Sequence, residues 1–323
     1  MNLGCKLFLL AVEEMNFTKA ASRAFVTQQC LSSHIKKLEE EYNVKIFERT
    51  PNLRLTPAGQ SLYHSLCQIQ IAEKAMIEKL TGIKDGLRGK IIFGINTTRA
   101  RIILPDLFAE YYQHFPLVKI SIVLADIENL VPKLLSGKLD VLLGIDCISN
   151  SDFNVLPLGQ DEVFFIATEA ILQKFAATPA AYEQTISSSE IDLVNFPGVP
   201  FAGNYDGSTF NTLVKRYLDS RNIHQEIVFS ISDYETQIAL CSRDQLVLFC
   251  PKTILEKVIE HNKKISPDKP LRIFKLCGMK DSLRIELITH KNAYQPLFAK
   301  ELIRLLQDHI QKNDQLIAEY IGF

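Results

Sequence analysis

Residues 16–59 read NFTKAASRAFVTQQCLSSHIKKLEEEYNVKIFERTPNLRLTPAG, and this stretch decides the fold of the N-terminal part of the chain. Apolar residues recur at helical spacing just before and within it, which predicts helices over residues 3–14, 18–25 and 28–42. Thr18 and Thr27 are the expected N-caps of the second and third helices. About three residues connect these two helices. The pattern is therefore a helix-turn-helix, an arrangement that places its third helix in a major groove.

A short hairpin is expected after the third helix. Ile46 and Phe47 can pack beneath the helices, and the segment TPNLRLT predicts a two-stranded wing that carries Arg54. Thr56 can cap a fourth helix, which Pro57 can begin.

Several short motifs give this stretch a family resemblance. They are the alanine pair at 20–21, Leu31–Ser32, the Ile35, Leu38 and Glu39 pattern, Phe47–Arg49, and the Leu55, Thr56, Ala58 and Gly59 pattern. In this order and spacing they resemble the winged helix-turn-helix of LysR-type transcriptional regulators. The resemblance implies that the partner is double-stranded promoter DNA, contacted from the start of the third helix and from the wing. The residues at the matching positions are Thr27, Gln28, Gln29, Ser32, Ser33, Lys36 and Arg54.

The chemistry of these side chains suits DNA, since Gln pairs with adenine through two hydrogen bonds and Lys and Arg neutralise phosphates. The alternative is that they only solvate an exposed helix. Two positions depart from the family: Ser33 stands where many relatives carry Arg, and the wing is one residue short, with Asn52 where a basic residue is common. Residues 1–58 carry eight basic and six acidic side chains, and the whole chain has a net charge of −1. Because this excess is small, we expect effective DNA binding to require a dimer.

A long helix is predicted over residues 59–88, between the DNA-binding domain at 1–58 and the rest of the chain. Its apolar positions are spaced alternately four and three apart, with Glu73 as the one polar member: Leu62, Leu66, Ile69, Met76, Leu80, Ile83 and Leu87. Such a heptad seam indicates pairing with a second copy of the same helix. The alternative is packing on its own domain. The resemblance implies a homodimer through this linker helix, and many relatives are tetramers, so a homotetramer is the expected assembly.

From Lys90 onward, strands alternate with helices, which predicts an α/β fold with parallel strands and right-handed crossovers. Two lobes are expected, the first over residues 89–161 and 267–323 and the second over 162–266, with crossings near Asp161 and Ser266–Lys269. This part resembles the effector domain of the same family, which has a two-lobed, periplasmic-binding-protein-like fold. The stretches that carry the resemblance are ILPDLFAEYYQHFP, LLSGKLDVLLG and the strand ending at Pro251.

A ligand of such a fold is expected in the cleft, near the carboxyl ends of strands. The loop NTTRAR lies between the first strand and a helix, so its backbone N–H groups and threonine hydroxyls would face the cleft at the positive end of the helix dipole. We therefore expect a small anionic effector held by Thr97, Thr98 and either Arg99 or Arg101. Asp126, Phe201, Ala202 and Asp233 are further candidate wall residues. The alternative is that Thr98 only caps the helix and both arginines point to solvent.

Other classes of function are less well supported. The chain has no GxGxxG, GxxxxGK[ST], HExxH or GxSxG motif and no histidine cluster, so we expect no enzyme, no cofactor and no metal site. No apolar run of about 18 residues predicts a membrane span, and no signal peptide is predicted. A cytoplasmic protein is the expectation, and a secreted solute-binding protein is disfavoured.

Seven cysteines are widely spaced without a CxxC motif, which is typical of reduced thiols. One alternative stays open, a thiol-redox regulator of the same fold. Cys241 and Cys250 flank a turn where relatives carry a GxG-like pair, whereas this chain has Asp244 and Leu246.

Overall fold

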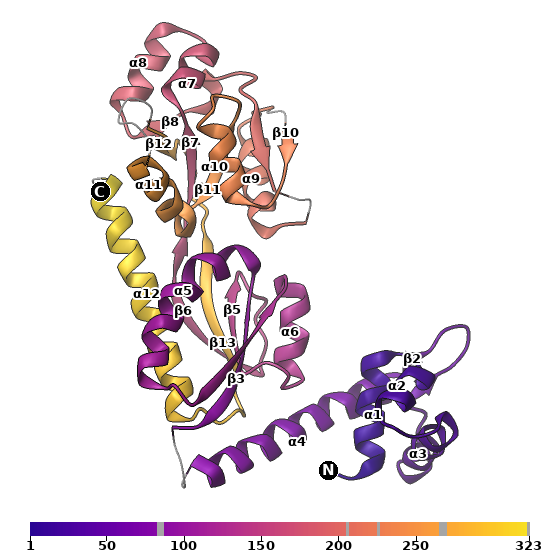
Figure 1. Cartoon of the computed structure of the whole chain (residues 1–323). Helices are drawn as coiled ribbons and strands as arrows, with labels where there is room; N and C mark the ends of the chain where they lie inside the picture. The colour runs from indigo at the N-terminus through magenta and orange to yellow at the C-terminus, as the bar shows by residue number, and fades with distance from the viewer. Residues whose placement is uncertain (83–86, 205–206, 225–226, 265–269, 322–323) are drawn as a thin grey trace.

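The computed structural model describes the chain except residues 83–86, 205–206, 225–226, 265–269 and 322–323 (Figure 1). A small helical domain at the N-terminus is followed by a long helix and by a two-lobed α/β region, stacked one lobe above the other. The predicted order of parts, a winged helix-turn-helix, a linker helix and a two-lobed α/β domain, is thus confirmed.

The N-terminal domain packs three helices and a wing around one core. Its elements are α1 (Leu3–Glu14), α2 (Phe17–Arg23), α3 (Gln28–Glu41) and the antiparallel pair β1 (Phe47–Glu48) and β2 (Arg54–Leu55). Phe8, Leu31, Ile35 and Ile46 are fully buried at the centre. The helical spacing of these apolar residues therefore orients α3 so that its polar face points away from the domain.

Helix caps fix the start of each helix. The Thr27 hydroxyl accepts a hydrogen bond from the backbone N–H of Cys30 at 3.1 Å, as predicted. The predicted Thr18 cap is wrong, because the side chain of Asn16 accepts from the backbone N–H groups of Thr18 and Lys19 and starts α2 one residue earlier. Asn is at least as good an N-cap as Thr.

The linker helix α4 (Pro57–Gly82) begins at the predicted cap, where Thr56 accepts from the backbone N–H of Gly59 at 3.0 Å. Its predicted seam has a buried part and an exposed part. Leu62 and Leu66 pack into the core of the N-terminal domain of the same chain, whereas Ile69, Met76 and Leu80 are exposed. Glu73 pairs with the amino group of Met1 at 2.7 Å. The predicted seam residue Ile83 lies outside the described residues.

Another face of α4 rests on the first lobe. Ile71 packs beside Gly137, and Lys74 forms an ion pair with Asp140. Near the N-terminal domain, Lys138 pairs with Glu13 at 2.9 Å. These contacts hold the helical domain against the α/β region.

Lobe I is a five-stranded sheet in the order β4-β3-β5-β13-β6, with helices on both faces. The strands are β3 (Gly89–Ile95), β4 (Val118–Leu124), β5 (Val141–Ile145), β6 (Phe153–Asp161) and β13 (Leu283–His290). The helices are α5 (Thr97–His114), α6 (Ile127–Leu135) and α12 (Leu297–Ile321). α5 and α12 cover one face and α6 the other. Only part of the sheet is parallel, because β13 returns antiparallel to both β5 and β6.

Lobe II is a six-stranded sheet in the order β10-β9-β11-β7-β12-β8. The strands are β7 (Val163–Ala167), β8 (Glu190–Ile191), β9 (Phe201–Gly203), β10 (Ile227–Ser230), β11 (Val247–Pro251) and β12 (Arg272–Leu276). The helices are α7 (Glu169–Phe175), α8 (Pro179–Ser187), α9 (Thr209–Ser220), α10 (Tyr234–Cys241) and α11 (Leu255–Lys264), with short 3-10 turns η1 (Leu193–Asn195) and η2 (Lys252–Ile254).

Among the described residues, two connections run between the sheets of the two lobes, and the C-terminal part of α12 also packs on lobe II, where Ile317 joins its core. The first crossing lies at Asp161–Val163, as predicted. The second prediction is wrong, because β12 pairs with β7 inside lobe II, so the chain returns between Leu276 and Leu283. The predicted position, Ser266–Lys269, lies outside the described residues.

Candidate functional site

The exposed face of α3 displays the polar residues expected at its start. Gln28, Gln29, Ser33 and Lys36 are exposed and Ser32 is half-buried, while Leu31 and Ile35 between them are buried. Lys36 lies 3.5 Å from Glu40, one turn along the same helix. Both side chains of that pair are well exposed, so a phosphate could replace Glu40 at little cost.

The wing places Arg54 on the exposed side of β2. Its guanidinium pairs with Glu48 on the neighbouring strand. This pair orients the arginine, but it also sets a carboxylate beside the surface where a phosphate would bind. Among the residues expected to contact DNA, the two cations are thus Lys36 on α3 and Arg54 in the wing, and each is paired with an acid.

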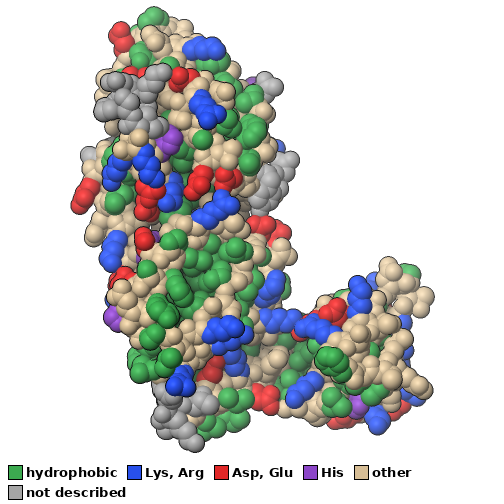
Figure 2. Space-filling model, viewed as in Figure 1, with side chains coloured by type: hydrophobic (Ala, Val, Ile, Leu, Met, Phe, Trp, Pro, Cys, Tyr) green, Lys and Arg blue, Asp and Glu red, His purple; other side chains and the backbone are tan. Residues whose placement is uncertain are grey.

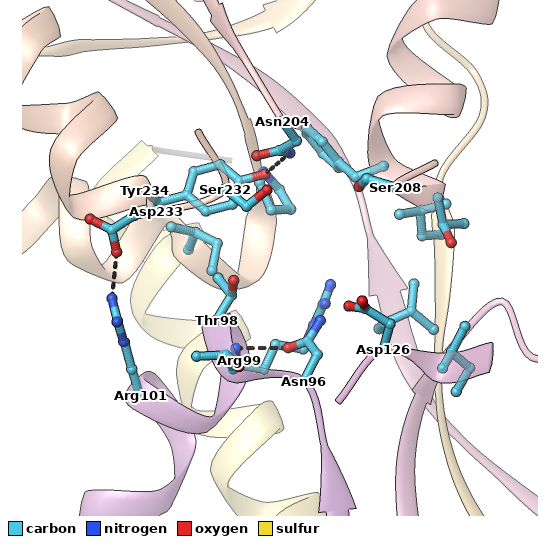
Figure 3. A pocket seen from close by; sticks show the side chains of 18 of the residues that line it. Asn96, Thr98, Arg99, Arg101, Asp126, Asn204, Ser208, Ser232, Asp233 and Tyr234 are labelled. Carbon is cyan, nitrogen blue, oxygen red and sulfur yellow. Dashed lines mark hydrogen bonds and ion pairs between the residues drawn. The ribbon is translucent and has the colours of Figure 1, made fainter. Parts of the chain in front are cut away.

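A cavity of about 520 Å³ lies between the two lobes. Four helices begin at it, α5 and α6 from lobe I and α9 and α10 from lobe II, and the N-cap residue of each lines the cavity: Asn96, Asp126, Ser208 and Asp233. Figure 3 shows these side chains around the open space, with Thr98 directed into it. Helix N-termini carry unpaired N–H groups and a partial positive charge, so their convergence makes a site suited to an anion.

Behind the lining of the cleft, Arg99, Asp161 and Thr253 form a cluster named the floor, of which Arg99 lines the cavity and Asp161 is buried beneath it. Arg99 on α5 pairs with Asp161 at the first crossing, and Asp161 is fully buried. The carboxylate also accepts from the backbone N–H and the hydroxyl of Thr253, each at 2.9 Å. Arg99 and Asp161 both belong to lobe I, and the hydrogen bonds from Thr253, which follows β11, tie this pair to lobe II.

The rim of the cleft, defined as Arg101 and Asp233, is a second ion pair that spans the two lobes (Figure 3). Asp233 also caps α10, accepting from the backbone N–H of Thr236 at 3.0 Å and from its hydroxyl at 2.6 Å. These hydrogen bonds from Thr236, with the nearby Arg101 cation, hold the pKa of Asp233 below its ordinary value. Arg101 is exposed, so this pair can exchange partners with solvent or with a ligand.

Two family patterns match the chain. The "Bacterial regulatory helix-turn-helix protein, lysR family" matches residues 4–60, and the "LysR substrate binding domain" matches residues 84–311, which is more than half of the chain. The chain belongs to the LysR family of transcriptional regulators. LysR-type regulators combine a DNA-binding helix-turn-helix with an effector-binding domain, and bind promoter DNA and small-molecule effectors.

Curated relatives agree with the family. The HTH-type transcriptional regulator BudR of Raoultella terrigena is 30% identical over 159 residues, which are 48% of this chain and 55% of that protein. CysL of Bacillus subtilis is 25% identical over 228 residues, 70% of this chain and 72% of that protein. The matched part thus spans little more than half the length of BudR. Relatives of this kind are regulators of transcription and not enzymes.

The fold is shared with solved LysR-family structures. A full-length cysteine-to-aspartate variant of OxyR from Pseudomonas aeruginosa superimposes with a TM-score of 0.64 at 20% sequence identity, covering 95% of this chain and 96% of that one. A cysteine mutant of Corynebacterium glutamicum OxyR gives a TM-score of 0.57 at 19% identity, over 98% of this chain and 94% of that one. At these identities the likeness concerns the LysR fold alone.

Six of the eight LysR-type effector residues expected from the sequence line the cavity: Thr97, Thr98, Arg99, Arg101, Asp126 and Asp233. The expectation that Phe201 and Ala202 are wall residues is wrong. Both lie on β9 and point to opposite faces of the lobe II sheet, each into a hydrophobic core. Alternation along a strand that is covered on both faces leaves neither side chain for the cavity.

Sequence reasoning missed several polar lining residues of lobe II. Asn204 follows β9, and its amide donates to the Tyr234 hydroxyl at 3.0 Å, while Ser208 caps α9 (Figure 3). These positions carry the same signal as NTTRAR, polar residues between a strand and the helix that follows it. Applying that rule to lobe II would have found them.

The two cysteines on which the thiol-redox alternative depends are buried. Cys241 and Cys250 are both fully buried, and desolvation raises the pKa of each thiol well above its ordinary value. Since the thiolate is the reactive form, burial lowers the reactivity of both thiols. The turn between them keeps the geometry that glycine favours, because Asp244 has a φ of 60° and its carboxylate accepts from the Thr168 hydroxyl.

Among the described residues, no group of three or more His, Cys, Asp or Glu side chains could hold a metal ion. Across the same residues, no helix is long and apolar enough to cross a membrane.

Proposed function

We propose that this regulator reads promoter DNA with α3 and the wing and responds to a small anionic effector bound between its lobes. The observation that carries the effector assignment is the convergence of four helix N-termini on one cavity. The helix-turn-helix of a LysR-type regulator binds DNA.

DNA reading is assigned to the residues that α3 and the wing expose. Gln28 and Gln29 suit base edges, and Lys36 and Arg54 suit phosphates. Thr27, Ser32 and Ser33 complete the surface with hydroxyl groups. Acidic neighbours hold both cations, so each subunit binds weakly and a dimer supplies the rest.

The dimer is assigned to the exposed stripe on α4. Ile69, Met76 and Leu80 recur at heptad spacing and are each more than half exposed, which fits the seam of a two-helix pair. Further association to a tetramer is assigned to lobe I. Several of its large apolar side chains are exposed, among them Phe108, Tyr112, Leu117, Ile122 and Leu124, and Figure 2 shows apolar side chains gathered over this lobe.

The effector is assigned by charge. Thr98 and the N-termini of α5, α9 and α10 surround the space for an anionic group, and Arg101 can turn from Asp233 toward it. Asp126 lies across the space from Arg101, below Ser208, and makes no capping hydrogen bond to its own helix (Figure 3). Its carboxylate disfavours a second negative charge there, so the effector carries its anionic group at one end.

A thermal-shift panel tests the effector assignment. Small carboxylates, inorganic phosphate and sulfate are compared with neutral amides and alcohols of similar size, on the wild-type protein and on Thr98→Val. Thr212→Val is the matched control, because Thr212 lies exposed on α9 outside the cavity lining. We expect one anion class to raise the Tm of the wild type and of the control but not of Thr98→Val.

That anion should also change the affinity of the wild type for the DNA upstream of its own coding sequence. Equal stabilisation of Thr98→Val, or stabilisation by neutral analogues alone, would contradict the assignment.

A further inference from the structure

Phe25 lies in the turn between α2 and α3, and its side chain projects from the domain surface. Its side chain is 96% exposed, the highest value among the exposed large hydrophobic residues of the described chain. Its backbone φ is 55°, in the left-handed region. A bulky residue in this conformation is a genuine outlier, and a fully exposed phenyl ring gains nothing from folding.

The hydrogen bonds of the turn show what a residue at this position has to do. The backbone N–H of Phe25 donates to the carbonyl of Ser22 at 3.1 Å, and that of Val26 donates to the carbonyl of Ala21 at 3.0 Å. This is the Schellman ending of a helix, in which the left-handed position is usually glycine. Val26 packs against the domain core, as the motif requires, but the ring of Phe25 has no such place. Glycine at position 25 would thus give a more stable turn than phenylalanine, so the phenylalanine has another role.

The position of the turn suggests that role. Phe25 precedes the α3 cap Thr27 by two residues, so the two Cα atoms lie within about 7.6 Å of each other. Gln28 and Gln29 follow at once, both exposed. DNA bound at the start of α3 would therefore pass close to residue 25, whose exposed side chain has no partner in the core.

We propose that Phe25 is a specificity-determining residue, whose ring packs on the C5-methyl group of a thymine at the edge of the major groove. Apolar contact with this methyl group is one of the direct ways a protein distinguishes thymine. Burial of the ring against DNA also explains why an exposed aromatic side chain is kept in a strained turn. This inference rests on the proposed reading of DNA by α3.

The test is a double-mutant cycle that combines a change in the protein with a change in the DNA. Phe25→Gly is compared with wild type on the promoter site mapped by footprinting, with each thymine replaced in turn by deoxyuridine, which lacks only the methyl group. We expect one thymine at which deoxyuridine weakens wild-type binding by about fourfold, the worth of one buried methyl group. The same replacement should leave Phe25→Gly unaffected, and that variant should bind the unmodified site about tenfold more weakly.

Stability gives the second readout. Phe25→Gly should denature at the same urea concentration as wild type or at a higher one, so weaker binding cannot come from unfolding. Tyr42→Ala is the matched control, because Tyr42 is an exposed aromatic residue at the opposite end of α3. It should bind the site as wild type does.

The outcomes separate the two claims. If wild type binds all DNA equally weakly, the proposed function fails. If wild type binds its site selectively and Phe25→Gly binds equally well, the inference fails while the proposed function stands. Loss of affinity without coupling to any thymine overturns the methyl contact. Loss of self-association in sedimentation, with unchanged DNA affinity per dimer, assigns the ring to a second copy of the chain and overturns the proposal.

Discussion

The floor and the rim of the effector cleft each hold one arginine–aspartate pair, and the two arginines are only two residues apart on α5. At the floor, Arg99 and Asp161 are buried and Thr253 donates two further hydrogen bonds. At the rim, Arg101 is exposed and Asp233 is also held by Thr236. The same chemistry thus serves two purposes. The buried pair fixes where the lobes join, and the exposed pair can break when a ligand arrives.

Replacing Asp161 with Asn tests the floor and should have the largest effect. The change leaves the Arg99 cation buried without a counter-charge, which costs about 3–5 kcal/mol of unfolding free energy. Urea denaturation followed by circular dichroism measures the loss. Asp126→Asn, a change of the same kind at an exposed position, is the control. A loss below about 1 kcal/mol at position 161 would mean that the floor does not join the lobes.

Replacing Arg101 with Gln tests the rim. The lost ion pair is exposed, so the unfolding free energy should fall by less than about 1 kcal/mol. The difference from wild type should shrink further in high salt, because mobile ions screen exposed charges. Denaturation at low and high sodium chloride measures both. If the loss equalled that of Asp161→Asn, the distinction between floor and rim would be wrong.

Lowering the pH should remove the stabilisation that the charged Asp233 carboxylate gives to the rim. The pKa of Asp233 is lowered in the folded protein, by the hydrogen bonds from Thr236 and then by Arg101. Its carboxylate therefore stabilises the fold fully above its ordinary pKa of about 4, and this stabilisation is lost as pH falls through the lowered folded value. The stability difference between wild type and Asp233→Asn should be constant from about pH 7 to 5 and shrink below about pH 4. A difference that grows on acidification would reverse the sign and contradict the assignment.

Replacing Asp126 with Asn should change the stability least of all. Asp126 lines the cavity and makes no capping hydrogen bond, so stability should change by less than about 0.5 kcal/mol. Removing its charge should strengthen binding of the stabilising anion about two- to threefold, measured by titration calorimetry. Weaker binding would show that Asp126 accepts a hydrogen bond from the effector.

The sequence predicted best what is local. The helix-turn-helix, the wing, the Thr27 cap and the start of α4 follow from spacing and capping within a few residues. The loop NTTRAR was found because polar residues between a strand and a helix mark the end of a sheet, and its residues do line the cavity.

Long-range features escaped prediction for a physical reason. The partner of Arg99 is 62 residues away and the partner of Arg101 is 132 residues away, and no periodic pattern encodes such pairs. Phe201 and Ala202 were misassigned because a strand buried on both faces looks, in sequence, like one that ends at a cleft. The second crossing was misplaced because the apolar pattern of β12 does not show which sheet it joins.

Specific DNA binding tests the central claim most directly. Wild type is compared with Gln29→Ala combined with Lys36→Ala on the DNA upstream of its own coding sequence, at two salt concentrations. The account predicts tight, sequence-selective and salt-sensitive binding that the double variant loses, because α3 reads bases and phosphates together. Equally weak binding of any DNA by both proteins would contradict it.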